Sequence, residues 1–287
     1  MKNSGLFNLN DKKVKTPFRY AGGKYYALKY LLPYIAQIPH EEFREPFVGG
    51  GSVFFGKPKV KKNWINDIDA ELINTYKVMQ DPVKHKELIT LLENEIATPD
   101  RHTQVKESNP RSDIDRAFKY FYLNRTSYSG IMKKPAWGYR DDKSSPPKNW
   151  GAMIKNVHEK LKDVKITSLD FMEILLAPSS SKVLFYLDPP YLEADQKRAY
   201  KNHFLSEDHR RLSEALKKCK HSFILSYDNI DSLKEIYSWA TIIELTWNYN
   251  TSNIKGKERM KGKEIIITNI PFPTLKVQND YIQPRLL

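Results

Sequence analysis

The sequence is poor in cysteine: Cys219 is the single one among 287 residues. An internal disulfide and a zinc site built on cysteines are therefore excluded. The seven histidines show no metal-ligand spacing, so we expect no metal. No apolar run approaches the roughly 18 residues that a membrane-spanning helix needs, and Met1 to Lys15 is polar, unlike a signal peptide. These features predict a soluble protein of a reducing cytoplasm, with no membrane partner.

Acidic residues are also scarce relative to basic ones. The chain has 47 Lys+Arg against 34 Asp+Glu, a net charge of +13 and a pI near 9.4. This excess favours a polyanionic partner such as nucleic acid, although many basic proteins bind none. Hydrophobic residues make up 40% of the chain and aromatic residues 12%, which suffices for a real core. The length allows one large domain or two of moderate size.

Strand and helix patterns alternate near both ends of the chain and are interrupted by a helical block. This order predicts an α/β sheet with an inserted, mainly helical second domain at 71–165, flanked by the sheet segments 1–70 and 166–287. Residues 1–15 are expected to form a loose arm. Strands are predicted at 43–47, 63–67, 164–169, 183–187, 222–226, 241–245 and 264–268. Helices are predicted after Gly22-Gly23 until Pro33 or Pro39, near 53–55, and at 71–80, 83–96, 113–122, 153–161 and 207–218, with a polar loop at 133–149.

The segment Asp188-Pro189-Pro190-Tyr191 follows the apolar run 183–187, which reads as a buried parallel strand. Proline ends the pairing, so a carboxylate, a proline carbonyl and an aromatic ring gather at the carboxyl edge of the sheet, where α/β folds bind ligands. Two acceptors there, the Asp188 carboxylate and the Pro189 carbonyl, would suit the exocyclic amine of a flipped base stacked on Tyr191. A simple strand-ending turn, with Asp188 as a local cap, is an equal alternative for this motif alone.

Two glycine turns point to a ligand pocket. Gly49-Gly50-Gly51 follows a strand and lacks the lysine of a phosphate-binding loop. For these glycines alone, an ordinary tight turn between a strand and a helix is at least an equal alternative. Asp67 ends the next strand, where nucleotide-binding folds place an acid for ribose hydroxyls. We favour this role over the alternative that Asp67 or Asp69 caps the next helix.

The second turn, Gly22-Gly23, places Lys24 in a first helical turn, against the preference of helix N-termini for acids. Lys24 could hold a ligand carboxylate, with Tyr20 as an apolar wall. An exposed lysine on a surface helix is the alternative.

Basic and aromatic residues interleave at 121–130 and 133–140, as expected for DNA contacts on a loop-rich stretch. Lysines would anchor phosphates, and arginine or asparagine would contact base edges. The lysine cluster at 57–62 adds phosphate attraction or is a solvated face.

The motifs occur together in the order of one known family. The chain resembles Dam-type (D12 class) adenine-N6 DNA methyltransferases over roughly residues 17–270. Five motifs at sensible spacing carry the resemblance: Phe18–Lys24, Glu45–Ser52, Asn66–Ile68, Leu123–Thr126 and Asp188–Tyr191. Trp247–Asn250 and Lys263–Asn269 extend it.

This resemblance implies S-adenosylmethionine as methyl donor on a Rossmann-like sheet with an inserted target-recognition domain. Direct methyl transfer to a flipped adenine is expected, without a covalent enzyme intermediate. The catalytic residues implied are Asp188, Pro189, Pro190 and Tyr191. The cofactor contacts implied are Tyr20, Lys24 near the methionine carboxylate, Phe47, Gly49, Gly51, Asp67, Asp170 and Asp188. The DNA contacts implied are Asn124, Arg125, Lys133, Lys134, Tyr139 and Arg140.

The expected partner is double-stranded DNA, with a separate restriction endonuclease as a possible companion. We expect a bacterial or phage-encoded monomer associated with the nucleoid. The loop 135–140 is similar to a Dam loop, whereas 141–149 departs from that pattern, so GATC is only a hypothesis for the target. A catalytically silent DNA-binding module, and an amino-methyltransferase acting on RNA or cytosine, are the alternatives. Intact Lys24, Asp67 and Asp188 argue against the first, and Asp188 in place of serine argues against cytosine.

Overall fold

The computed structural model describes residues 14–20, 23–25, 27–191, 204–248 and 261–270. Most of the predicted N-terminal arm, the turn residues Ala21 and Gly22, and the pair Tyr249-Asn250 lie outside the described residues. In the part of the chain that is described, no helix is long and apolar enough to cross a membrane.

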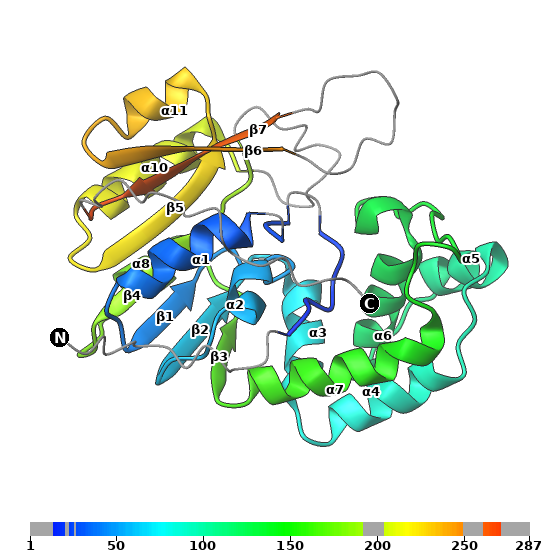
Figure 1. Cartoon of the computed structure of the whole chain (residues 1–287). Helices are drawn as coiled ribbons and strands as arrows, with labels where there is room; N and C mark the ends of the chain where they lie inside the picture. The colour runs from blue at the N-terminus through cyan, green and yellow to red at the C-terminus, as the bar shows by residue number, and fades with distance from the viewer. Residues whose placement is uncertain (1–13, 21–22, 26, 192–203, 249–260, 271–287) are drawn as a thin grey trace.

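A mixed sheet of seven strands forms one half of the molecule, and helices 70–161 form the other (Figure 1). The strands are β1 Glu42–Glu45, β2 Lys62–Asn66, β3 Val164–Thr167, β4 Val183–Leu187, β5 Ser222–Asp228, β6 Thr241–Asn248 and β7 Lys261–Thr268. The α-helices are α1 Leu28–Gln37, α2 Ser52–Gly56, α3 Ala70–Gln80, α4 Lys84–Glu93, α5 Pro99–Glu107, α6 Asp113–Thr126, α7 Trp150–Leu161, α8 Phe171–Leu176, α10 Ser206–Lys217 and α11 Asp231–Ile236. Two short 3-10 turns, η1 Tyr128–Gly130 and η2 Pro147–Asn149, lie between α6 and α7.

The strand order is β3-β2-β1-β4-β5-β7-β6. Strands β1 to β5 pair in parallel, whereas β7 is antiparallel to both β5 and β6. The order of the chain reverses between β1 and β4, and this is the position where open α/β sheets form a ligand crevice. The sheet confirms the predicted Rossmann-like α/β fold.

The central strand β4 is buried along its whole length. Its side chains alternate between the faces of the sheet because successive residues of a strand point in opposite directions. Leu184 and Tyr186 join the apolar cluster that contains α1 and α2 side chains. Val183, Phe185 and Leu187 join the cluster that contains α8 and α10 side chains. Both faces are therefore covered, as the unbroken apolar run predicts.

The helical block shares its core with one face of the sheet. A single apolar cluster runs from Phe43 and Phe54 through Tyr76 of α3 to Phe121 and Trp150. The sheet and the block are thus packed together, and the predicted division of the chain at 71–165 stays a prediction.

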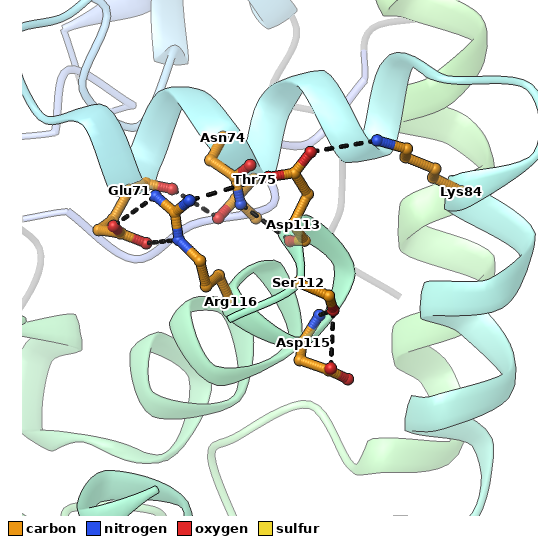
Figure 2. A network of polar contacts seen from close by, with 8 residues as sticks. All are labelled: Glu71, Asn74, Thr75, Lys84, Ser112, Asp113, Asp115 and Arg116. Atoms are coloured by element: carbon orange, nitrogen blue, oxygen red, sulfur yellow. Dashed lines mark hydrogen bonds and ion pairs between the residues drawn. The ribbon is translucent and has the colours of Figure 1, made fainter. Parts of the chain in front are cut away.

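A polar network ties the N-terminus of α6 to α3 and α4 (Figure 2). Arg116 contacts Glu71 with Nη2 and Oε1 2.6 Å apart, and Asn74 donates to the Asp113 carbonyl at 2.9 Å. Lys84 pairs with the Asp113 carboxylate at 3.2 Å. Such partly exposed pairs contribute about 0–1 kcal/mol each, so their main effect is to fix where α6 lies on α3.

The structure corrects several predicted boundaries. Of the two predicted ends of helix α1, Pro33 is wrong: the helix continues through it to Gln37, just before Pro39, because burial of Leu31, Tyr34 and Ile35 offsets the lost hydrogen bond. Helix α6 extends to Thr126, so its last turn is not part of a loop. Helix α5 was not predicted, although the Thr98 side chain caps it and Pro99 occupies its first turn.

Candidate active site

A pocket opens at the carboxyl ends of β1 and β4, with about 880 Å³ of atom-free space that includes its open mouth. Its lining includes the predicted cofactor residues Tyr20, Lys24, Phe47, Gly49, Gly51, Asp67 and Asp188. Pro190 and Tyr191 of the predicted catalytic group line it as well. Asp170 and Pro189 are outside the lining. The structure therefore brings together most of the residues that lie far apart in the sequence.

The glycine turn between β1 and α2 forms the floor of the pocket. Gly49 and Gly51 have φ of +46° and +71°, which side chains rarely adopt. A Cβ at Gly49 would lie 2.9 Å from Tyr20 Cε1, and one at Gly51 would lie 2.8 Å from the Phe55 ring. The turn thus requires glycine for both its conformation and its close contact with Tyr20.

Asp67 holds the glycine turn from the neighbouring strand. Its Oδ2 accepts a hydrogen bond from Gly49 N at 2.9 Å, and its Oδ1 accepts one from Asp69 N at 3.0 Å. Burial raises the pKa of Asp67 to about 6 despite these bonds. The helix cap is Asp69, which accepts from Glu71 N at 3.1 Å. Asp67 is therefore not the cap, and its carboxylate faces the pocket.

Lys24 is buried, with 4% of its surface exposed, so the alternative of an exposed surface lysine is wrong. Its Nζ lies 2.9 Å from Asp188 Oδ1 and 3.4 Å from Glu264 Oε1. The ammonium also donates to the Tyr191 hydroxyl and lies 4.4 Å from the centre of that ring. Lys24 is thus a partner of the Asp-Pro-Pro-Tyr segment.

Asp188 occupies the end of β4 and keeps 20% of its side chain exposed. Ser226 on β5 donates to its Oδ1 at 3.1 Å, and the Tyr186 hydroxyl shares a 2.9 Å hydrogen bond with Ser226. Burial raises the pKa of Asp188, and Lys24 opposes that shift. The carboxylate is held by an ammonium and a hydroxyl, as a positioned hydrogen-bond acceptor would be.

An aromatic wall closes one side of the pocket. The Phe47 ring lies 5.4 Å from Phe171 and 5.5 Å from Phe204, between ring centres. Asp170 caps α8 through Met172 N at 2.9 Å and lies next to Phe171. The prediction that Asp170 contacts the cofactor stays a prediction, which only this neighbouring ring links to the pocket.

Carboxyl groups stand at the same edge on five neighbouring strands: Asp67 after β2, Glu45 on β1, Asp188 after β4, Asp228 on β5 and Glu264 on β7. We call this set the acidic row. Sequence reasoning missed Glu45 and Glu264, although strand-end acids were its signal for Asp67. Glu45 is buried, and its Oε2 has no hydrogen-bond partner among the described residues. Burial and the nearby Asp188 raise its pKa well above the ordinary value.

Asn124, which was expected to contact DNA, is buried in α6. Its Nδ2 donates to the carbonyls of Arg19 at 2.8 Å and Gly130 at 3.1 Å, and its Oδ1 accepts from Arg19 N at 2.9 Å. Arg125 follows it, and burial next to Arg19 lowers the pKa of Arg125 to about 10. The Arg125 Nε is buried without a hydrogen-bond partner in the described part of the chain.

The other predicted DNA residues lie on the loop after α6. Lys134 and Arg140 are exposed, Lys133 is half-buried and Tyr139 is buried. Arg140 pairs with Asp142, with Nη2 and Oδ2 3.1 Å apart.

Elsewhere, Lys57 is 2% exposed and donates to the Pro58 carbonyl at 2.7 Å, so this residue does not belong to the exposed part of the 57–62 cluster, in which Lys61 and Lys62 are exposed. Burial lowers the pKa of Lys57 to about 7. Among the described residues, no group of His, Cys, Asp and Glu could hold a metal ion.

Comparison with known proteins decides the family. The model of the D12 class N6 adenine-specific DNA methyltransferases matches residues 20–251. The chain belongs to this family. It is 29% identical to the type II methyltransferase M1.LlaDCHI of Lactococcus lactis subsp. cremoris, over 92% of this chain and 98% of that protein. It is 28% identical to M.MjaIII of Methanocaldococcus jannaschii, over 90% and 99%. It is 22% identical to a DNA adenine methylase of Vibrio cholerae, over 91% and 98%.

Membership in the D12 class confirms the predicted resemblance and the predicted activity, methylation of adenine at N6. Methyltransferases of this class use S-adenosylmethionine in general, which agrees with a pocket at the switch point of the sheet.

Proposed function

We propose that this D12 methyltransferase transfers a methyl group from S-adenosylmethionine to the N6 amine of an adenine flipped out of duplex DNA, at the Asp188 corner. The observation that carries the proposal is the ion pair between the buried Lys24 and the half-buried Asp188, 2.9 Å apart, beside the glycine turn. Removing charges from water is costly, and a titratable group that is perturbed by burial and by a specific charge partner in a cleft is a candidate for a functional site.

The pocket suits a cationic nucleoside ligand. S-Adenosylmethionine supplies, when bound, an electrophilic methyl group on a positively charged sulfur. The glycine turn lets a ligand approach the backbone, and Phe47 offers an aromatic face. The Glu45 Oε2, which has no hydrogen-bond partner within the described part of the chain, is a further polar group in the lining. We assign the ribose to Asp67 and the adenine end to Phe47 with Asp170. The ion pair with Asp188 supports a place for Lys24 at the reacting amine rather than at the methionine carboxylate.

The chemistry at the corner follows from its acceptors. An aromatic amine is a poor nucleophile because its lone pair is delocalised into the ring. The Asp188 carboxylate and the Pro189 carbonyl would accept the two N6 hydrogens and favour a pyramidal nitrogen. Tyr191 would stack on the extruded base, which is worth about 1–3 kcal/mol. Pro190 keeps the corner rigid because its φ is fixed.

DNA would lie across the loop after α6. Lys133, Lys134 and Arg140 would contact phosphates, and Arg125 would supply a base contact or a phosphate contact. Because Asn124 and Tyr139 are buried, we assign them to the packing beneath that surface rather than to DNA contacts. We propose a monomer that serves in restriction-modification or Dam-like methylation in the cytoplasm of a bacterium or of a phage-infected cell, with GATC as the first target to test.

The test is Asp188→Ala in a radiolabelled methyl-transfer assay on duplex DNA. We expect transfer to fall by at least about 100-fold, since a positioned acceptor at the reacting group is lost, while cofactor binding by calorimetry stays measurable. Glu159→Ala, an exposed acid on α7, is the matched control. Retained transfer would remove Asp188 from the catalytic role. Sequencing of DNA from cells that express the chain would give the methylated base and the target. Methylation of RNA or cytosine instead would overturn the substrate.

A further inference from the structure

One buried cation lies between the half-buried carboxyl group of Asp188 and the buried one of Glu264 at the active site. Lys24 Nζ is 2.9 Å from Asp188 Oδ1 and 3.4 Å from Glu264 Oε1. The exposed fractions of the three side chains are 4%, 20% and 11%. Glu264 lies on β7. In the sheet, β5 separates β7 from β4, the strand that precedes the Asp-Pro-Pro-Tyr corner. Lys24 therefore bridges two acids from separate strands.

Two carboxyl groups, those of Asp188 and Glu264, share the single positive charge of Lys24. If both acids were ionised, the site would carry a net buried negative charge, which is unfavourable in a low-dielectric interior. Glu264 is the acid that is poised to take up a proton: burial and Asp188 raise its pKa to about 7, against the effect of Lys24. Its Oε2 is buried with no hydrogen-bond partner in the described residues. Asp188, in contrast, accepts from Ser226 as well as from Lys24.

Methylation of an amine needs such a proton acceptor. When the amine nitrogen uses its lone pair to form a bond to the methyl carbon, the carbon–sulfur bond breaks and its electron pair stays on sulfur. The nitrogen is then a cation and must release one proton to give the neutral methylamine. The nearest protein acceptor in the proposed function is Asp188, which already compensates Lys24.

We propose that Asp188, Lys24 and Glu264 form a proton relay in which Glu264 is the final acceptor. Asp188 takes the proton from the methylated nitrogen. Lys24 gives one of its own protons to Glu264, and its nitrogen, which then has a free lone pair, takes the proton from Asp188, so Lys24 is again an ammonium and Asp188 returns to the carboxylate. One proton has moved to Glu264, and it leaves to solvent afterwards. The relay rests on the proposed role of Asp188. Glu264 does not touch the substrate and acts only through Lys24, so it is a positioning residue.

Few other titratable groups face Glu264. Tyr186 and Tyr191 lie close to it, and burial raises the pKa of both phenols well above the ordinary value, so they stay neutral. Asp228 on β5 is directly opposite Glu264 in the strand register. On β6 the opposite residue is the apolar Leu245. Among these, Asp188 raises the pKa of Glu264, whereas the Lys24 ammonium and the hydrogen bond with Tyr191 lower it.

The test is Glu264→Gln, which keeps the shape and an acceptor oxygen for Lys24 but cannot take up a proton. Single-turnover methyl transfer is measured from pH 5.5 to 9, together with cofactor and DNA affinity. We expect the wild-type rate to rise with pH through about 7, as Glu264 loses its proton. The variant should lose this rise and at least about 10-fold in rate at pH 8 with unchanged affinities. Glu244→Gln, an exposed acid on β6 paired with Lys234, is the control and should behave as wild type.

A second readout needs neither cofactor nor DNA. Infrared difference spectra of the ligand-free protein against pH should show a carboxyl group that titrates near 7 and disappears in Glu264→Gln. Glu264→Asp should restore part of the pH dependence. A variant with the wild-type rate and pH profile overturns the relay and leaves the function standing. A rate loss matched by weaker binding means a structural role and also overturns it. If wild type fails to methylate DNA, the proposed function fails, and the infrared titration still decides whether Glu264 takes up the proton.

Discussion

The Asn124 side chain forms hydrogen bonds with both backbone polar groups of Arg19: its Oδ1 accepts from Arg19 N at 2.9 Å, and its Nδ2 donates to Arg19 O at 2.8 Å. Arg19 directly precedes Tyr20, which covers the glycine turn, and its segment leads to Lys24. Asn124 also donates to Gly130 at the start of the basic loop. A single buried amide therefore connects the loop proposed to contact DNA with the segment that leads to Lys24.

Asn124→Ala should weaken that connection. The variant leaves backbone groups of Arg19 without their partners, which costs about 1–3 kcal/mol of unfolding free energy. We expect DNA affinity to fall more than cofactor affinity, because the loop after α6 loses its anchor. Urea denaturation, calorimetry and fluorescence anisotropy measure the three quantities. Asn109→Ala changes an exposed asparagine and should alter none of them. Equal losses in cofactor and DNA affinity would show that Asn124 serves only general stability.

Gly49→Ala should damage the cofactor pocket. Alanine at φ +46° is strained by about 1–2 kcal/mol, and its Cβ would meet Tyr20 at 2.9 Å. We expect cofactor affinity to drop by at least about 10-fold, as the turn or the tyrosine must shift. Gly151→Ala in α7, where a Cβ would lie 3.0 Å from Ile89, is the matched glycine control. Unchanged calorimetric binding by Gly49→Ala would exclude this turn from the cofactor site.

The free energy of unfolding should fall as pH rises, because the buried Asp67 carboxyl loses its proton. Its folded pKa of about 6 lies above the ordinary 3.8, so the folded state binds the proton more tightly. This contribution to the unfolding free energy is complete below pH 4 and is lost through pH 6, by about 3 kcal/mol. Asp67→Asn should therefore show a flatter pH profile in urea denaturation.

Asp142→Asn gives a control of opposite sign. The Arg140 guanidinium lowers the pKa of Asp142, so its contribution is present at higher pH and is lost as pH falls. If the profiles of Asp67→Asn and wild type run parallel, burial does not set the protonation of Asp67.

DNA binding should depend steeply on salt, since the lysines of the loop displace counterions from phosphates. Replacing Lys133 and Lys134 with alanine should weaken binding to all sequences alike and reduce the slope of log affinity against log salt by about 1 per lysine. Filter binding at salt concentrations from about 50 to 300 mM measures the slope. Lys162→Ala, just before β3 at the amino edge of the sheet, is the control. An unchanged slope would remove this loop from the DNA surface.

The strands and the pocket were predictable because both depend on local signals. Runs such as 183–187 are apolar on both faces, and glycine turns and strand-end acids mark the carboxyl edge. Parallel strands bring these ends together whatever lies between them, so Gly49, Asp67 and Asp188 could be placed in one pocket before the fold was known.

Residues whose role depends on a distant partner could not be predicted in this way. Asn124 in a helical motif gives no sign that it bonds Arg19. Glu264 faces Lys24 only because β7 inserts between β5 and β6, antiparallel to both. Lys57 looks like part of a surface charge run, and only the packing around Phe43 shows that it is buried. Helix α5 is so polar that it has almost no apolar periodicity, and the Thr98 cap is its clearest signal in the sequence.

The position of β7 also has a consequence for synthesis of the chain on the ribosome. Strand β6 pairs with β7 and not with β5, so within the described residues it has no place in the sheet until β7 has emerged. Glu264 arrives with that same strand, long after Lys24 and Asp188. A nascent chain would therefore carry the floor of its pocket well before the Lys24 cluster is complete, because Glu264 joins that cluster only after β7 has been synthesised.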